Sequence, residues 1–186
     1  HDLPAPQLLE LVGPEASAVP HMVLSYVPGV ALDSLHTDDL PARQRRRLLG
    51  DLIDIVAAIR SIPAASWPEP GPAWATLWNR LAEQAAGCRD LPADVREHHA
   101  GLAAAAAAVA TSTRPRVFHG DLGGVNCRID AGTGAVTGVL DWDSAAVGDP
   151  ATDIAALLSG LGPRTAEELR GRSPLWRREE QRYQVY

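Results

Sequence analysis

The chain has 186 residues, of which 46% are hydrophobic, so it can form a compact domain with a sizeable core. Its formal net charge of −6 argues against a nucleic-acid partner, because phosphate backbones attract basic surfaces. Two isolated cysteines do not make a disulfide framework or a zinc site, which indicates a reducing, cytoplasmic location. No apolar run reaches the roughly 20 residues of a membrane span, so no membrane partner is expected.

The first part of the chain is predicted to contain two strands and a helix. Short apolar runs predict strands over residues 8–12 and 22–27, and Pro28-Gly29 is a strong turn signal after the second. Apolar residues at steps of three and four predict a helix over residues 38–62. Four arginines near its start are interpreted as a solvated helix face: Arg43, Arg45, Arg46 and Arg47.

The middle of the chain is predicted to be helical. Residues 63–72 are rich in proline and are expected to form a connector. A helix is then predicted over residues 74–86, with Leu77, Trp78 and Leu81 on one face. Residues 93–110 are rich in alanine, which has the highest helix propensity, and predict a further helix.

The last part of the chain returns to short strands before it ends in helices. Residues 116–118 predict a strand that leads into a loop. Apolar strands over residues 127–129 and 136–140 flank a Gly-rich turn and are typical of a hairpin. Asp149-Pro150 is expected to begin a helix through residue 158. Residues 165–186 predict one or two more helices.

The densest group of polar residues lies around this predicted hairpin. The strand would deliver His119 and Asp121 into a loop, and Asn126 follows just beyond it. The hairpin returns the chain, so Asp141 can lie close to Asn126. Magnesium takes hard oxygen ligands and retains several waters, so an amide and a carboxylate suffice to hold it. With a second carboxylate to orient a hydroxyl nucleophile, this set predicts magnesium-dependent phosphoryl transfer.

Each of these residues alone has a structural interpretation, as a loop histidine, a turn former or a strand end. The combination is more specific, since His-Gly-Asp-x4-Asn is expected by chance about once in a thousand chains of this size. The segment resembles the aminoglycoside phosphotransferase family, a branch of the protein-kinase-like fold. The family signature continues with a strand ending in Asp141-Trp142, then Gly148-Asp-Pro and a further aspartate at Asp153.

The resemblance implies a fold class and a domain organisation. The fold would be α+β and protein-kinase-like. Residues 30–186 would form the mainly helical C-terminal lobe, which carries a small catalytic β-hairpin and binds the acceptor. Residues 1–29 would be a remnant of the N-lobe sheet together with the hinge.

The resemblance also implies a role for each matching residue. Asp121 would be the catalytic base, and His119 would support the catalytic loop. Asn126 and Asp141 would hold Mg²⁺, and Asp153 would brace the loop from the following helix. The activity implied is transfer of the γ-phosphate of a nucleotide to a hydroxyl of a small molecule, such as an aminoglycoside antibiotic.

The hinge of the family would fall on residues 22–29. Backbone groups near Ser25, Tyr26 and Val27 would hold the base of ATP or GTP. The family's smaller lobe also carries a lysine, but all 17 basic residues of this chain are arginine. We therefore expect the chain to be a fragment that would have little or no activity alone.

Three other functions are compatible with parts of the sequence. A haloacid-dehalogenase-type phosphatase is suggested by the strand and Asp-x-Asp pattern at Asp141, but that chemistry requires a lysine. A metal-dependent phosphoesterase built on Asp121 would need histidines after His119, and there are none. A degenerate kinase-like binding scaffold is the third, although it would not need Asp121, Asn126 and Asp141 together.

The acceptor is left open by the sequence. Polycationic aminoglycosides would suit a cleft lined by carboxylates, while macrolides, amino alcohols and sugars remain alternatives. Trp74, Trp78 and the connector of residues 63–72 are candidate acceptor contacts. Packing in the core is the alternative role for both tryptophans.

Overall fold

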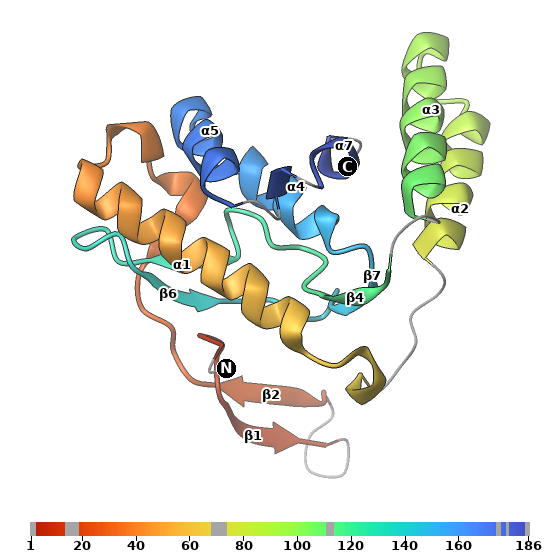
Figure 1. Cartoon of the computed structure of the whole chain (residues 1–186). Helices are drawn as coiled ribbons and strands as arrows, with labels where there is room; N and C mark the ends of the chain where they lie inside the picture. The colour runs from red at the N-terminus through yellow and green to blue at the C-terminus, as the bar shows by residue number, and fades with distance from the viewer. Residues whose placement is uncertain are drawn as a thin grey trace.

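A central body of helices and short antiparallel strands carries two projecting hairpins (Figure 1). The computed structural model describes residues 3–13, 19–67, 74–110, 114–173, 176–177 and 179–184. The α-helices are α1 (Ala42–Ser61), α2 (Trp74–Gly87), α3 (Ala93–Ala110), α4 (Ala151–Ser159), α5 (Pro163–Arg172) and α7 (Glu180–Tyr183). These bounds confirm the four long helices expected from the sequence, and α1 begins four residues later than predicted.

The strands form three small antiparallel sheets. They are β1 (Leu8–Val12), β2 (His21–Leu24), β3 (Val30–Ala31), β4 (Arg116–Phe118), β5 (Cys127–Ile129), β6 (Val136–Val139) and β7 (Ala146–Gly148). β1 pairs with β2, β5 lies between β3 and β6, and β4 pairs with β7. The β5–β6 hairpin is as expected, whereas β3 and β7 were not predicted, and β2 ends three residues early.

The core lies between α1 and α4, with β4, β5 and β6 contributing to it. Leu48, Leu52 and Ile59 of α1 are at most 1% exposed, as their helical spacing predicts. Ile154 of α4 and Ile129 of β5 belong to the same buried cluster. The core therefore fixes α1 and α4 relative to the strands that position the polar loop.

The four-arginine cluster of α1 is a solvated face only in part. Arg43, Arg46 and Arg47 are exposed, but Arg45 is 6% exposed, which corrects the prediction. The Nε of Arg45 lies 2.8 Å from a carboxylate oxygen of Glu168 on α5. The guanidinium also donates to the carbonyl of Leu40 at 2.8 Å. Arg45 thus joins α1 to α5, a contact that helical spacing alone does not indicate.

Replacing Arg45 with alanine is expected to lower the free energy of unfolding by about 2 kcal/mol, because Glu168 loses a largely buried partner. Arg46→Ala on the exposed side of the same helix should change it by at most about 0.5 kcal/mol. Urea unfolding followed by circular dichroism measures both. Equal effects would mean that the Arg45–Glu168 ion pair does not stabilise the fold.

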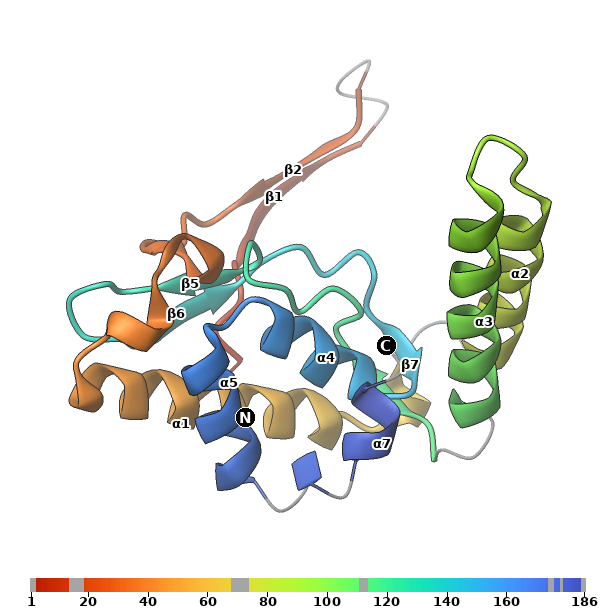
Figure 2. The same cartoon turned by 90° about the horizontal axis from the view of Figure 1, so that it is seen from above.

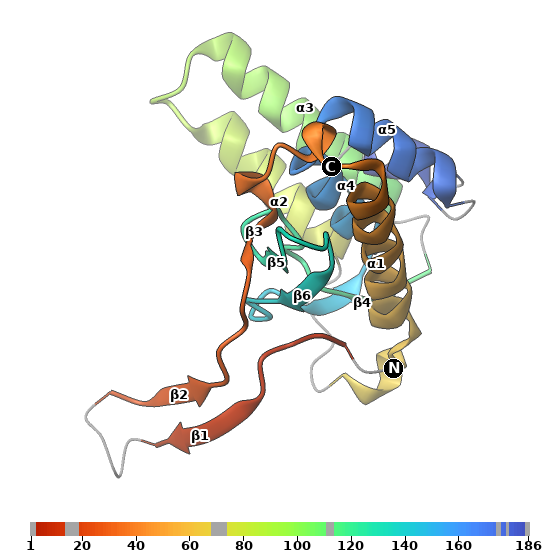
Figure 3. The same cartoon turned by 90° about the vertical axis from the view of Figure 1, so that its left-hand side faces the viewer.

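Two hairpins stand away from the body (Figure 2, Figure 3). The β1–β2 hairpin extends as a ribbon, and α2 and α3 pack against each other beside the body. Both strands of the ribbon expose large apolar side chains: Leu8, Leu9, Leu11, Met22, Val23 and Leu24. Among the helices of the described residues, none is both long and apolar enough to cross a membrane.

The side chains of Trp74 and Leu77, and residues 68–72 of the predicted connector, lie outside the described part. Trp78 is half-buried and Leu81 is 38% exposed on α2. The predicted apolar face of this helix is therefore only partly covered.

Candidate active site

Two antiparallel strand pairs bring the predicted catalytic residues to one edge of the body. The β4–β7 pair ends where the loop after Phe118 begins. The β5–β6 hairpin ends at Val139, and the N–H of Leu140 donates to the carbonyl of Asn126 at 2.8 Å. The expected proximity of Asn126 and the start of the Asp141 segment is therefore confirmed.

His119 is fully buried directly after β4 and links the loop to the hairpin. Its Nε2–H donates to the carbonyl of Leu140 at 3.0 Å, and its Nδ1 accepts the N–H of Asp121 at 3.3 Å. Burial lowers the pKa of His119, although the carbonyl of Leu140 acts in the opposite direction. The ring is therefore neutral, with its proton on Nε2, and it holds the backbone of Asp121 in place.

Asp121 and Asn126 form a direct side-chain pair. The Asn126 Nδ2 donates to the Oδ2 of Asp121 at 2.8 Å and to the carbonyl of the same residue at 2.9 Å. Asn126 is 8% exposed, whereas the Asp121 carboxylate is exposed. The amide N–H groups of Asn126 are directed at Asp121, so its amide oxygen is the atom that can act as a ligand to a cation.

Asp141 follows β6 in a conformation unusual for a residue with a side chain. Its φ is 62°, in the left-handed region, which costs about 1 kcal/mol for a non-glycine residue. The nearby negative charge of Asp143, a hydrogen bond with it and partial desolvation raise the pKa of Asp141, and Asp121 adds to the effect. Three carboxylates thus repel one another at the surface, and a bound cation would relieve that repulsion.

The residues present fit a magnesium ion. Asn126 and Asp141 offer oxygen atoms, the ligand type that magnesium prefers. Within the described residues, no group of three or more histidine, cysteine, aspartate or glutamate side chains is arranged to hold a metal. Magnesium retains waters and binds substrate phosphates, so two protein ligands are a sufficient set.

Asp153 in the first turn of α4 holds the catalytic loop by hydrogen bonds to its backbone. Its two carboxylate oxygens accept the N–H groups of His119 at 2.9 Å and Gly120 at 3.0 Å. Burial raises the pKa of Asp153 to about 6, while these two N–H groups and the charge of Arg60 act in the opposite direction. The brace suggested by the family resemblance is therefore present as two hydrogen bonds.

Asp153 is expected to make stability depend on pH. Because its pKa is higher in the folded chain than the ordinary 3.8, the folded state retains a proton between pH 4 and 6. The free energy of unfolding should therefore fall by about 3 kcal/mol as pH rises through this window.

Urea titrations of the native chain and of Asp153→Asn between pH 4 and 7 measure this effect. The difference between the two chains should shrink by about 3 kcal/mol with rising pH, because the substituted side chain does not titrate. Other carboxyl groups, such as Asp38 with its lowered pKa, contribute equally to both chains and cancel. A difference that stays constant with pH would contradict the raised pKa.

The segment predicted to be the hinge lies against the catalytic hairpin. Arg128 donates to the carbonyl of Gly29, and the Thr137 hydroxyl donates to the carbonyl of Pro28 at 2.5 Å. The N–H of Val139 also donates to the carbonyl of Pro4 at 2.6 Å. Both chain segments that lead into the β1–β2 ribbon are thus attached to the hairpin.

The three predicted base-binding residues differ in their free backbone groups. The N–H of Ser25 donates to the carbonyl of Gln7 at 2.8 Å, and its hydroxyl accepts the N–H of Gln7 at 2.8 Å. Within the described residues, the backbone groups of Tyr26 and Val27 have no such partners, and the Tyr26 side chain is 84% exposed. The N–H donor available to a ligand is therefore at Tyr26 or Val27, and that of Ser25 is occupied.

Two features of the site were not found by reasoning from the sequence. The ring of Trp142 packs edge-on against His119, with ring centroids 4.6 Å apart, and donates to the carbonyl of Val139 at 3.0 Å. Gly120 has a φ of 86°, and a Cβ there would overlap the carbonyl of Ser144. The glycine inside His-Gly-Asp was the available signal for this close approach.

The sequence and the fold were compared with known proteins. The phosphotransferase enzyme family (APH) matches residues 1–184, and the chain belongs to this family. A viomycin phosphotransferase of Streptomyces vinaceus is 33% identical over 170 residues, which cover 82% of this chain and 53% of the relative. An aminoglycoside 3'-phosphotransferase of Streptomyces fradiae is 30% identical over 161 residues, covering 83% and 58%. The chain thus spans little more than half the length of these relatives.

Solved structures show the same fold. The GDP complex of aminoglycoside 2'-phosphotransferase-IIIa superposes with a TM-score of 0.78 at 19% identity, covering 99% of this chain and 65% of that protein. The predicted protein-kinase-like α+β fold is therefore confirmed. The family assignment also removes the haloacid-dehalogenase alternative for Asp141.

Proposed function

We propose that the protein transfers the γ-phosphoryl group of ATP or GTP to a hydroxyl of a small-molecule antibiotic, with magnesium as cofactor. The observation that carries the proposal is the contact between Asn126 and the Asp121 carboxylate, beside the exposed Asp141. This arrangement would supply a positioned base and two oxygens for a cation at one edge of the body. The names of the two relatives support an antibiotic acceptor of the aminoglycoside or viomycin type, and antibiotic resistance as the role.

Asp121 would accept a hydrogen bond from the acceptor hydroxyl and orient its oxygen toward the phosphorus atom. Its carboxylate is exposed, so an acceptor can reach it, and its position is held from both sides. Asn126 holds the side chain, and neutral His119 holds the backbone N–H. Such positioning is the main contribution that proteins make to phosphoryl transfer.

Asn126 and Asp141 would hold a magnesium ion, which supplies positive charge to the phosphate oxygens when bound. Tyr26 and Val27 would bind the nucleotide base through their backbone groups, and the GDP complex of the structural neighbour supports a nucleotide at this fold. The carboxylates of Asp121, Asp141 and Asp143 would also attract a cationic acceptor. We place this activity in the cytoplasm, where nucleotides and reduced cysteines occur.

The proposal is tested on the full-length protein with ATP and GTP, magnesium, and a panel containing viomycin, kanamycin, a macrolide and an amino alcohol. Mass spectrometry should detect an acceptor heavier by one phosphoryl group, and EDTA should abolish its formation. If none of the antibiotics in the panel were phosphorylated, the proposed acceptor class would be wrong. Nucleotide binding without transfer to any acceptor would instead favour the binding scaffold.

A further inference from the structure

A hollow of about 530 Å³ lies at the opposite end of β4 from the catalytic loop. Arg116 begins β4 and lines this hollow, whereas His119 follows the end of the same strand. The hollow is lined by Ala57, Arg60, Ser61, Arg114, Arg116, Pro150, Glu179 and Arg182. We call it the basic pocket.

The charge of the basic pocket is opposite to that of the chain. Four arginines and one glutamate line it, in a chain whose formal net charge is −6. The arginines come from α1, the segment before β4, β4 itself and α7, so folding brings together charges that are far apart in the sequence. Collecting like charges costs free energy unless an anion offsets it.

Arg114 and Arg116 supply two guanidinium groups that are not ion-paired within the described part of the chain. Pro115 restricts Arg114 to extended backbone, and in extended chain residues two apart lie on the same side. Val117, the next residue along, points to the opposite side of the strand and is fully buried. Within the described residues, neither arginine makes an ion pair or a side-chain hydrogen bond, and both are exposed. Their ten N–H donors are therefore available to a ligand.

Arg60 and Arg182 make the inner wall of the pocket rigid. The side chain of Arg60 is 9% exposed and donates to Glu179 at 2.7 Å and to the carbonyl of Pro150 at 2.9 Å. Arg182 donates to Asp149 and Glu179, each at 3.2 Å. The Nε of each arginine is buried without an acceptor among the described residues. Glu179 pairs with both arginines and Asp149 pairs with Arg182, so charge is balanced at this wall, and the excess positive charge of the pocket comes from Arg114 and Arg116.

We propose that the basic pocket binds an oxyanion of the phosphate class, either inorganic phosphate or the phosphoryl group of a larger molecule. Guanidinium groups bind phosphate oxygens in pairs through charge-assisted hydrogen bonds, and four of them converge here from different elements. The site is separate from Asp121 and does not depend on the proposed transfer reaction. Its inner wall is built by ion pairs, and its outer wall carries the two exposed arginines, Arg114 and Arg116.

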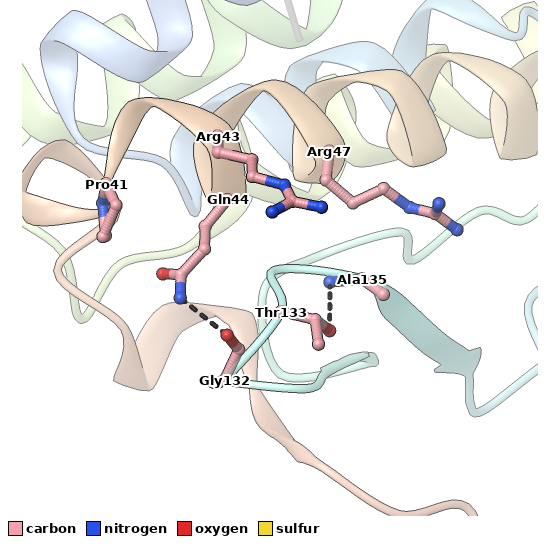
Figure 4. A pocket seen from close by; sticks show the side chains of 7 residues that line it. All are labelled: Pro41, Arg43, Gln44, Arg47, Gly132, Thr133 and Ala135. Atoms are coloured by element: carbon pink, nitrogen blue, oxygen red, sulfur yellow. Dashed lines mark hydrogen bonds between the residues drawn. The ribbon is translucent and has the colours of Figure 1, made fainter.

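A second hollow, of about 790 Å³, does not share these properties (Figure 4). It lies between α1 and the turn of the β5–β6 hairpin, and only Arg43 and Arg47 line it with charge. Arg47 already pairs with Asp51 at 2.9 Å, and Gln44 donates to the carbonyl of Gly132 at 2.7 Å. Among the residues that the structure describes, this hollow offers only the guanidinium of Arg43 without an ion pair, whereas the basic pocket offers two such groups beside two ion-paired arginines.

The test is calorimetric titration of inorganic phosphate into the full-length protein, with EDTA present, no nucleotide, and constant ionic strength. Native protein should bind with a Kd of about 1 mM or below, a strength that a few charge-assisted hydrogen bonds provide. The Arg114→Gln/Arg116→Gln double variant should bind about tenfold more weakly or not at all. Because both side chains are exposed and unpaired, its thermal unfolding should match that of the native protein.

The matched control is Arg46→Gln/Arg89→Gln, which removes the same charge from exposed arginines outside the pocket. This control should bind phosphate as the native protein does. If phosphate affinity were weakened equally in both double variants, the effect would be due to net charge alone and the proposal would be overturned. Absence of phosphate binding by the native protein would also overturn it. A parallel titration with phenyl phosphate separates the two sources, since tighter binding than inorganic phosphate indicates the phosphoryl group of a larger molecule.

Discussion

Asp121→Asn should reduce the turnover of the full-length phosphotransferase by about 10²–10⁴-fold, the range by which a positioned general base accelerates a reaction. Asparagine retains an oxygen that can accept the Asn126 amide, so the pair seen at 2.8 Å can persist. What disappears is the negative charge and the basicity that we propose orient the acceptor hydroxyl. Initial rates at saturating nucleotide and acceptor measure the change.

The control for this variant is Asp54→Asn, which removes a carboxylate from an exposed position on α1 away from the loop. Both proteins should unfold at nearly the native temperature, so that lost turnover in Asp121→Asn reflects chemistry. The affinity for the nucleotide should also be retained, because Asp121 is not among the residues proposed to bind the nucleotide base or the metal. Native turnover in Asp121→Asn would show that another group orients the hydroxyl.

Gly120→Ala should destabilise the protein by about 3 kcal/mol or more and abolish turnover together with it. The left-handed backbone at this position contributes about 1–2 kcal/mol of strain for alanine. The added Cβ also meets the carbonyl of Ser144, which is backbone and cannot rotate away. Chemical unfolding and initial rates on the same preparations test both effects.

Gly123→Ala in the same loop provides the matched comparison. Its φ is not in the left-handed region, and the nearest atom to an added Cβ is a carboxylate oxygen of Asp121 at 3.8 Å. Stability should change by less than about 1 kcal/mol, and alanine can even stabilise by restricting the unfolded chain. If the two glycines tolerate alanine equally, close packing of the loop on Ser144 does not limit the fold.

The elements that the sequence predicted are those with strong local patterns. α3 and β4 have the predicted bounds, because a run of alanine favours a helix and the apolar pair Val117-Phe118 precedes a loop. β3 and β7 have only two and three residues, and each exists because a distant strand offers it hydrogen bonds. Arg45 was assigned to solvent because its partner Glu168 lies on α5, 123 residues further along the chain.

The candidate site divides in the same way. Side chains that carry chemistry were visible in the signature, so Asp121, Asn126 and Asp141 could be proposed from spacing alone. Part of what fixes the loop is backbone, such as the carbonyl of Leu140 that accepts from His119 and the carbonyl of Ser144 that closely approaches Gly120. Every residue has a backbone carbonyl, so the residue type does not indicate which carbonyls make these contacts. Only the three-dimensional structure identifies them. The left-handed backbone of Asp141 is hidden for the same reason.

The attachment of the hinge segment to the catalytic hairpin has a mechanical consequence. Thr137 and Arg128 hold Pro28 and Gly29, and Pro4 is held by Val139, so the backbone proposed to bind the base and the hairpin proposed to hold the metal would move together. Beyond these tethers, β1 and β2 are bonded mainly to each other. Opening and closing around a nucleotide would then be a movement of the β1–β2 ribbon alone. The hinge segment and the catalytic hairpin would already be in place before the nucleotide binds.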